Sequence, residues 1–188
     1  MRILGVVCSP RIGGNTEILV KEALEGAKGK GADVKLLTLS GRQIKPCDHC
    51  GACYERGECH IKDDMGEIYQ QFLEADGIIL GSPVYFWSVS AQAKLVMDRT
   101  YALRYPTKRL KDKVGGAIAV AGRRGQMIAL TLMNNFFLGQ GMIPAGLGVD
   151  SRGSGRGDVK EDGRAMREAK NLGERMVELL KMRSKESR

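Results

Sequence analysis

The stretch Arg2–Lys28 reads RILGVVCSPRIGGNTEILVKEALEGAK and decides the fold, because it joins a strand to a helix through a short polar loop. Residues 2–8 are almost all apolar, as expected for a parallel strand that is covered on both faces. From Thr16 to Lys28 the apolar residues recur at helical spacing, and Asn15 or Thr16 suits the helix N-cap. The stretch therefore predicts the first strand–loop–helix unit of a parallel α/β sheet.

The rest of the chain repeats this alternation. Further strands are predicted at 32–39, 77–81, 114–121 and 142–149. Further helices are predicted at 63–73, 90–100, 127–138 and about 160–182, with an irregular basic stretch at 101–113 and a frayed end at 183–188. This pattern predicts an α/β fold in one domain, residues 1–188: a flavodoxin-like, doubly wound, five-stranded parallel sheet of order 2-1-3-4-5, with a cysteine-rich loop after strand two. Ligands of such sheets bind at the carboxyl ends of the strands.

The composition is that of an ordinary globular protein, with 43% hydrophobic and 28% charged residues among 188. No run of about 18 apolar residues occurs, so we expect no membrane span. The chain opens on a strand rather than on a signal-peptide pattern, so we expect a cytoplasmic protein. The net charge is +8, but there is no basic stripe interleaved with aromatic residues and no nucleic-acid motif, so we expect no nucleic-acid partner.

The loop after the first strand carries groups that bind a terminal phosphate. It offers hydroxyl, amide and guanidinium groups and a glycine that lets the backbone approach closely, namely Ser9, Arg11, Gly14, Asn15 and Thr16. The helix beyond presents free N–H groups and the positive end of its dipole. The loop is neither G-x-G-x-x-G nor a Walker A motif, so a dinucleotide or NTP site lacks its usual signature. We predict a phosphate-monoester site, the alternative being a polar turn that only caps the helix.

Two further loops are predicted at the same edge. The one after strand three is apolar and aromatic, consisting of Pro83, Val84, Tyr85, Phe86 and Trp87. Three consecutive aromatic residues cannot all point inward, so a flat apolar ligand would explain them, with burial in the core as the alternative. The loop after strand four adds backbone N–H groups and a cation, suited to the N1–O2 edge of a flavin, from Ala121, Gly122 and Arg123. A phosphate site, a flat slot and this sheet together predict FMN.

Four of the five cysteines lie within thirteen residues at the spacing C-x2-C-x2-C-x5-C, namely Cys47, Cys50, Cys53 and Cys59. A [4Fe–4S] cluster needs four converging thiolates, and the segment 46–60 supplies three from one tight turn and the fourth a few residues later. Zinc is an alternative, because His49 and His60 lie in or beside the segment, although we expect both at the surface. Disulfides or free thiols are a further alternative, disfavoured in a reducing compartment. Cys8 is expected in the core.

Three motifs carry a resemblance to a known family. S-P-R-x-G-G-N-T at 9–16, G-S-P-V-Y-F at 81–86 and A-Q-x-K-x-x-M-D-R at 91–99 resemble the flavodoxin-like NAD(P)H-dependent FMN reductase superfamily. With the cysteine segment included, the chain resembles the iron–sulfur flavoproteins of anaerobic microbes over about residues 1–150. Two features depart from the family pattern, namely Cys8, where a small residue is common, and the short fourth loop. The resemblance implies an oligomer with the cluster by a subunit interface, and dioxygen or peroxide as acceptors.

These observations support three functional hypotheses. The first is an electron-transfer oxidoreductase that passes electrons from a ferredoxin-like one-electron donor through a [4Fe–4S] cluster to FMN and on to a small acceptor, in a homo-dimer or tetramer. The cysteine segment follows strand two and the flavin loops follow strands one, three and four, so both sites are expected at the same edge of the sheet. Strand two is, however, an outer strand about 10 Å from the switch point, so the cluster is expected nearer to a neighbouring subunit's flavin than to its own. The second is an NAD(P)H-dependent FMN or quinone reductase with zinc or no metal at the cysteines. The third, a nucleic-acid-associated redox sensor, lacks a motif.

Overall fold

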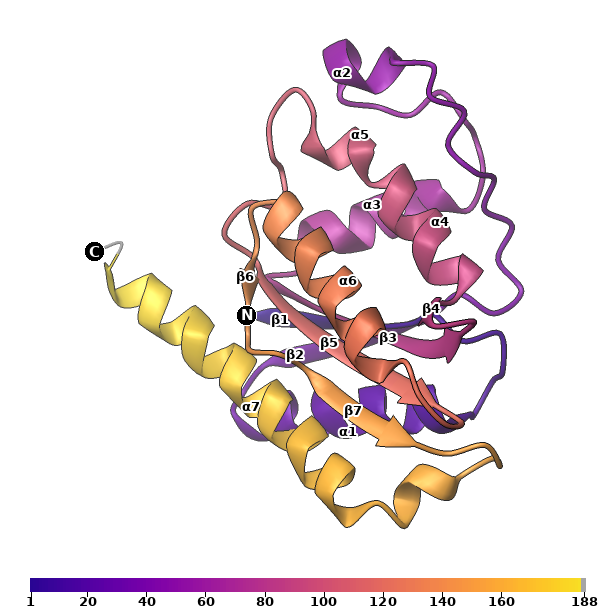
Figure 1. The fold of residues 1–188 in the computed structure, drawn as a ribbon. Coiled ribbons are helices and arrows are strands. Elements are labelled where there is room, and N and C mark those ends of the chain that lie inside the picture. Colours follow the sequence, from indigo (N-terminus) through magenta and orange to yellow (C-terminus); the bar gives the residue numbers. More distant parts are fainter. Residues whose placement is uncertain (187–188) are drawn as a thin grey trace.

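The computed structural model describes residues 1–186, which form a parallel sheet with helices on both faces (Figure 1). The strands are β1 (Arg2–Val7), β2 (Asp33–Thr38), β3 (Gly77–Tyr85), β4 (Ser88–Val89), β5 (Val114–Ala121), β6 (Ile143–Pro144) and β7 (Val149–Arg152). The helices are α1 (Asn15–Gly29), α2 (Ala52–Arg56), α3 (Met65–Glu74), α4 (Ala91–Arg99), α5 (Tyr101–Arg104), α6 (Gln126–Gly139) and α7 (Gly163–Glu186), with a short 3₁₀ helix at Asp158–Lys160. None of these helices combines the length and the apolar character needed to cross a membrane.

The strand order confirms the predicted topology. The sheet runs β2-β1-β3-β5-β6, with β7 also paired to β5 and β4 to β3. All pairs are parallel except the β3–β4 hairpin. Once β6 and β7 are taken as one interrupted fifth strand, this is the flavodoxin-like order 2-1-3-4-5. The carboxyl ends of β1, β3, β5 and β7 therefore meet at one edge of the sheet.

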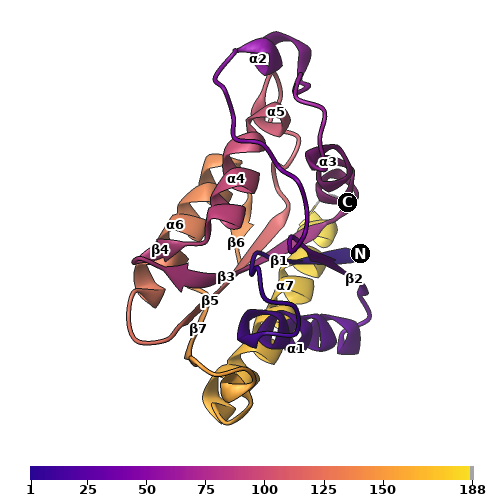
Figure 2. The same cartoon turned by 90° about the vertical axis from the view of Figure 1, so that its right-hand side faces the viewer.

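An apolar core lies on each face of the sheet. Figures 1 and 2 show the helices that cover the two faces. On one face, the alternate side chains of β1 pack against α1 and α7, with Ile3 and Val7 fully buried. On the other face, Leu4 and Val6 point toward α3, α4 and α6. Both faces of β1 are covered, which is why this strand is apolar at nearly every position.

The predicted fifth strand is interrupted and extends beyond its expected end. β6 pairs with the start of β5, whereas β7 pairs with its end and continues to Arg152. Gly146 and Gly148, which lie between the two strands, have φ of 142° and 110°. Backbone in this left-handed region leaves the pleat, so the single strand expected at 142–149 is wrong in its bounds.

Three other expectations on local structure need correction. The strand expected at 77–81 continues to Tyr85, because Ser82 and Pro83 pair with β5 and Val84 pairs with β4. The stretch expected to be irregular begins with α5. The end expected to fray from residue 183 is helical through Glu186, while residues 187 and 188 lie outside the described part.

Candidate functional site

A cavity of about 260 Å³ lies at the carboxyl edge of the sheet, where four loops meet. Nine of the predicted cofactor-binding residues line it: Ser9, Arg11, Gly14, Asn15, Thr16, Pro83, Val84, Tyr85 and Gly122. Val120 and the loop after β7 complete the wall, the latter through Gly153, Ser154, Gly155 and Arg156. We call this the edge cavity. Two arginines, several glycines and three serine or threonine hydroxyl groups give it the chemistry of a phosphate site.

The phosphate loop differs from the prediction at the helix cap. Gly14, not Asn15 or Thr16, is the N-cap of α1, and no side chain caps this end. The first N–H groups of α1 are therefore free of a side-chain cap at the wall of the cavity. Ser9 accepts a hydrogen bond from the backbone N–H of Arg11 at 3.1 Å, which closes the turn.

The side chain of Asn15 instead ties the phosphate loop to the loop after β7. Its Nδ2 donates to the carbonyl of Gly155 at 2.8 Å, and its Oδ1 accepts from the N–H of Gly157 at 2.8 Å. A Cβ at Gly153 would lie 2.6 Å from the same Nδ2, so the two loops pack in direct contact. From the sequence alone, residues 153–157 (GSGRG) are expected to form a flexible loop. The glycines, the serine and the arginine of this loop resemble the composition of the phosphate loop. This resemblance is the sequence signal that could have identified 153–157 as part of the site.

The aromatic loop forms a hairpin that separates its residues. Phe86 and Trp87 are the two turn residues between β3 and β4, with φ of 45° and 67°. Positive φ at both positions is typical of a type I′ turn and unfavourable for aromatic residues. They line an adjoining open cavity of about 470 Å³ with Arg123 and Arg124, whereas Tyr85 lines the edge cavity. The structure thus places Phe86, Trp87 and Arg123 beside the edge cavity rather than within it.

Ala121 lines neither of these two cavities. It ends β5 with 2% of its surface exposed, and its carbonyl accepts from the N–H of Gly153. Its position therefore fixes the loop after β7 rather than the wall of the cavity.

Cys8, the fifth cysteine, is fully buried directly after β1, as expected, and burial raises its pKa to about 12.

A second cavity, also of about 260 Å³, is lined by all four clustered cysteines, Cys47, Cys50, Cys53 and Cys59. We call it the cysteine cavity. None of the four forms a disulfide. Two turns with left-handed glycines, Gly51 and Gly57, bracket the short helix α2 that carries Cys53. Burial raises the pKa of Cys53, and the charges of the other three thiols act in the same direction. Four thiolates around one cavity repel one another, so the arrangement favours a bound cationic centre.

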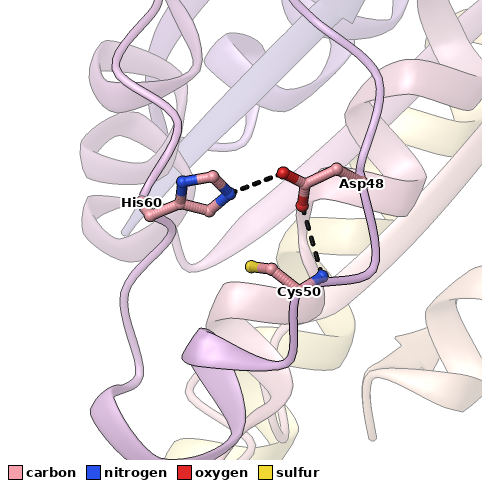
Figure 3. Close-up of side chains that lie close together, drawn as sticks. All are labelled: Asp48, Cys50 and His60. Carbon is pink, nitrogen blue, oxygen red and sulfur yellow. Dashed lines mark hydrogen bonds and ion pairs between the residues drawn. The ribbon is translucent and has the colours of Figure 1, made fainter.

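Three potential ligands lie close together at the exposed side of this segment (Figure 3). Asp48 Oδ2 lies 2.8 Å from His60 Nε2, and Asp48 Oδ1 accepts the N–H of Cys50 at 3.3 Å. Asp48 and His60 are each about half exposed, and His49 is exposed as well, so both histidines are at the surface as predicted. Among the described residues, this is the one group of three or more such ligands whose atoms all lie within 4.8 Å of one another. No three of the four cysteine sulfurs are that close.

A buried ion pair lies at the base of the cysteine segment, which is the point where its two flanking residues, Lys45 and Ile61, come together. Arg99, at the end of α4, bonds Asp63 through both terminal nitrogens, and both side chains are almost fully buried. Asp63 also accepts the N–H of Lys45 at 2.8 Å and that of Met65 at 3.0 Å. Burial alone would raise the pKa of Asp63, but the bonds from Arg99, Lys45 and Met65 outweigh it and lower the pKa.

The two cavities lie at different ends of α4, so the sequence inference that both sites share one edge of the sheet is corrected. The N-cap of α4, Ser90, bonds the carbonyl of Cys8 next to the phosphate loop, whereas Arg99 at the other end lines the cysteine cavity. The cavities are thus separated by about the length of this nine-residue helix, ~13 Å. The segment after β2 runs away from the edge, and both views show α2 at the far end of the molecule (Figures 1 and 2).

Comparison with known proteins identifies the family. Residues 1–151 match the NADPH-dependent FMN reductase family. An iron–sulfur flavoprotein from Methanocaldococcus jannaschii is 42% identical over 191 residues, which cover 97% of this chain and 98% of that protein. The chain belongs to the iron–sulfur flavoproteins of this reductase family. This flavoprotein is therefore a flavin-dependent oxidoreductase, and its family supports FMN as the cofactor.

Further relatives extend the assignment over the whole flavoprotein. An iron–sulfur flavoprotein from Archaeoglobus fulgidus is 40% identical and covers 95% of this chain and 96% of its own. Among solved structures, the Trp repressor binding protein from Bacillus subtilis is 26% identical, with a TM-score of 0.69 over 90% of this chain and 99% of its own. The first relative matches nearly the whole length of both chains, and the second shares the flavodoxin-like sheet.

Proposed function

We propose that this flavoprotein passes electrons from a ferredoxin-like one-electron donor, through a [4Fe–4S] cluster at Cys47, Cys50, Cys53 and Cys59, to FMN in the edge cavity and on to a small acceptor such as dioxygen or hydrogen peroxide. The cluster would exchange one electron at a time and FMN one or two, which is the chemistry that joins such partners. The observation that carries the proposal is that all four thiols line one cavity, separate from the edge cavity.

The spread of the sulfurs favours a cluster over a single zinc ion. Zinc held by thiolates at about 2.3 Å would bring its sulfurs to within about 3.8 Å of one another. No three of these sulfurs lie within 4.8 Å of one another in the described structure, so their spacing is wider than a single zinc ion requires. The group Asp48, Cys50 and His60 is close enough for a single ion, but two of its members already bond each other at the surface.

FMN would lie across the edge cavity with its phosphate at the start of α1. The free N–H groups of α1, with Arg11 and Arg156, would hold the phosphate dianion. Tyr85 and Val84 would contact the flat ring system, and the backbone of Gly122 would lie near its edge. The adjoining aromatic residues and Arg123 would flank the opening where an acceptor approaches.

The separation of the cavities supports an oligomer. Within one chain, α4 separates the cysteines from the edge cavity, so the shorter route for an electron would lead to the flavin of a neighbouring subunit. We infer a homo-dimer or tetramer in which the cysteine segment of one subunit faces the edge cavity of another. No membrane or nucleic acid takes part in this arrangement.

The first test is chemical composition. We expect anaerobically purified protein to contain iron, sulfide and FMN, and an EPR signal after reduction with dithionite. In Cys53→Ala the iron should be lost and the FMN kept, whereas the control Cys8→Ala, which removes a buried thiol beside the phosphate loop, should keep the iron. Flavin without iron or sulfide in the wild type would refute the cluster.

The alternative function is an NAD(P)H-dependent FMN or quinone reductase with zinc or no metal at the cysteines. The match to the NADPH-dependent FMN reductase family is the observation that favours it. Stopped-flow reduction separates the two. Rapid reduction by NADPH but not by reduced ferredoxin, or zinc in place of iron, would select the alternative.

A further inference from the structure

Arg99 is a fully buried cation at the base of the cysteine segment. Its Nη1 donates to the carbonyl of Lys45 at 2.8 Å, and its Nη2 donates to the carbonyl of Ile61 at 3.3 Å. These two carbonyls lie just before and just after the segment 46–60. Arg99 therefore holds both ends of the cysteine segment through its terminal nitrogens, which also bond Asp63.

The remaining donor group of Arg99 is its Nε–H. Its Nε is buried and has no hydrogen-bond partner within the part of the chain that the structure describes. A buried N–H without an acceptor is rare, and it often marks a partner that the protein atoms do not supply. Arg99 lines the cysteine cavity together with Cys59, so the missing partner would belong to the group held there.

Of the two charged side chains in the Arg99–Asp63 ion pair, the positive one, Arg99, lines the cysteine cavity. Asp63 instead lines a neighbouring cavity, and Cys59 lines both cavities. Asp98 also lines the cysteine cavity, but its carboxylate is exposed and bonds Lys94 at 2.6 Å. Water screens such an exposed pair, while the buried guanidinium acts through a medium of low dielectric constant.

We propose that Arg99 sets the reduction potential of the cysteine-held cluster, because it places a fixed, buried positive charge, and an Nε–H donor without a partner among the described residues, at the wall of the cysteine cavity. The proposal rests on the proposed function, in which the four cysteines hold an iron–sulfur cluster. Each electron that the cluster accepts adds a negative charge to the site. A nearby cation stabilises that charge, and a hydrogen bond to a ligand sulfur has the same effect, so both raise the potential. Arg99 is thus a positioning and tuning residue rather than a ligand.

The test compares charge removal at buried and exposed positions by EPR-monitored redox titration of anaerobically purified protein. Arg99→Gln removes the buried cation, and its matched control Arg56→Gln removes an exposed cation on α2 within the same segment. Asp63→Asn removes the buried counter-charge, and its control Glu58→Gln removes an exposed acid beside Cys59. Iron, sulfide and FMN contents are measured first for every variant.

A lower potential is expected in Arg99→Gln, with the reduction equilibrium constant at least tenfold smaller, which is about 59 mV for one electron. Asp63→Asn should raise the reduction potential, because it removes the negative charge that partly compensates the charge of Arg99. Both controls should shift it less than their buried counterparts. A purely structural role would loosen the segment in both buried variants and would not move the potentials in opposite directions.

The outcomes separate this inference from the function on which it rests. Wild-type protein without iron and sulfide would overturn the cluster itself. Wild-type protein with a cluster, but with the same potential in Arg99→Gln and Arg56→Gln, would overturn only the role of Arg99. If Arg99→Gln and Asp63→Asn both lose the cluster while the two controls keep it, the pair only fastens the segment, and the tuning role is refuted.

Discussion

At the scale of single residues, Tyr85 and Phe86 are neighbours in the chain that line different cavities. Tyr85 is 44% exposed on the wall of the edge cavity, whereas Phe86 is 99% exposed at the turn. Aromatic contacts typically contribute about 0.5–1.5 kcal/mol beyond the buried area, so Tyr85→Ala should weaken FMN binding by roughly threefold to tenfold. Phe86→Ala should leave the dissociation constant within about twofold. Titration of FMN into apoprotein, followed by fluorescence quenching, measures both, and equal losses would contradict the assignment.

Asp63 gives a prediction with a defined pH dependence. Its pKa is lowered in the folded protein, so the stability that it contributes is present above its unfolded pKa of about 3.9 and is lost as the pH falls through the folded value. Removing one partner of a buried pair typically costs about 3–5 kcal/mol, so Asp63→Asn should lower the melting temperature at pH 7. Melting curves of metal-free wild type and variant should converge as the pH is lowered below about 4. A difference that stays constant down to pH 3 would contradict this role.

The residue scale also shows how far the sequence alone leads. The position of the loop 9–16 at the edge cavity was predictable, because a loop between a parallel strand and the following helix lies at the carboxyl edge of the sheet. The contact partner of Asn15 was not, because it lies 140 residues away and depends on how β7 pairs with β5. Arg99 belongs to a recognisable motif, but only the folded chain brings it between Lys45 and Ile61.

At the scale of elements, strand identity and order were predictable, and strand ends were not. Apolar runs such as residues 114–121 are read directly as buried strands. The break between β6 and β7 depends on glycines in the left-handed region, and the β3–β4 hairpin depends on two aromatic residues that adopt positive φ. Neither conformation follows from hydrophobic periodicity, because it records which face is buried and not the local dihedral angles.

The packing of α1 against α7 gives the prediction at this scale. The two helices are so close that a Cβ on Gly26 would lie 2.1 Å from the carbonyl oxygen of Lys170. Gly26→Ala should therefore destabilise the protein by about 1–3 kcal/mol or more, despite the gain of about 1 kcal/mol in helix propensity. Gly29→Ala on the same helix is the matched control, because a Cβ there meets nothing within 4 Å. Urea denaturation should show a lower midpoint for Gly26→Ala, and an unchanged or higher one for Gly29→Ala.

At the scale of the whole molecule, the chain carries two sites that its own fold keeps apart. The sequence places the cysteine segment directly after β2, which suggested that it stays at the ligand edge. In the structure, Asp63 accepts hydrogen bonds from the backbone N–H of Lys45 and from the guanidinium of Arg99. Because Arg99 lies at the end of α4, these bonds place the cysteine segment away from the ligand edge. The order of elements along the chain thus predicts where the cysteine segment leaves the sheet. Contacts with residues distant in the sequence determine where the cysteines lie in the folded chain. In the proposed oligomer, the cysteine cavity of one subunit would face the edge cavity of another, which would give the electron a shorter route.

Complementation between two inactive variants tests this intersubunit route. Cys53→Ala removes a thiol of the cysteine cavity, and Arg11→Glu combined with Arg156→Glu places two negative charges where the FMN phosphate would bind. Each variant alone should fail to transfer electrons from reduced ferredoxin to a small acceptor, because it lacks one of the two centres. After the variants are mixed under conditions that exchange subunits, some interfaces pair an intact cysteine cavity with an intact edge cavity of another subunit. If electrons cross between subunits, ferredoxin-dependent turnover should reappear, up to about a quarter of the wild-type rate by random pairing in dimers, because half of the dimers are mixed and one of their two routes is intact. Unmixed variants carried through the same treatment are the control, and mixed oligomers that remain inactive would show that electrons travel within one chain.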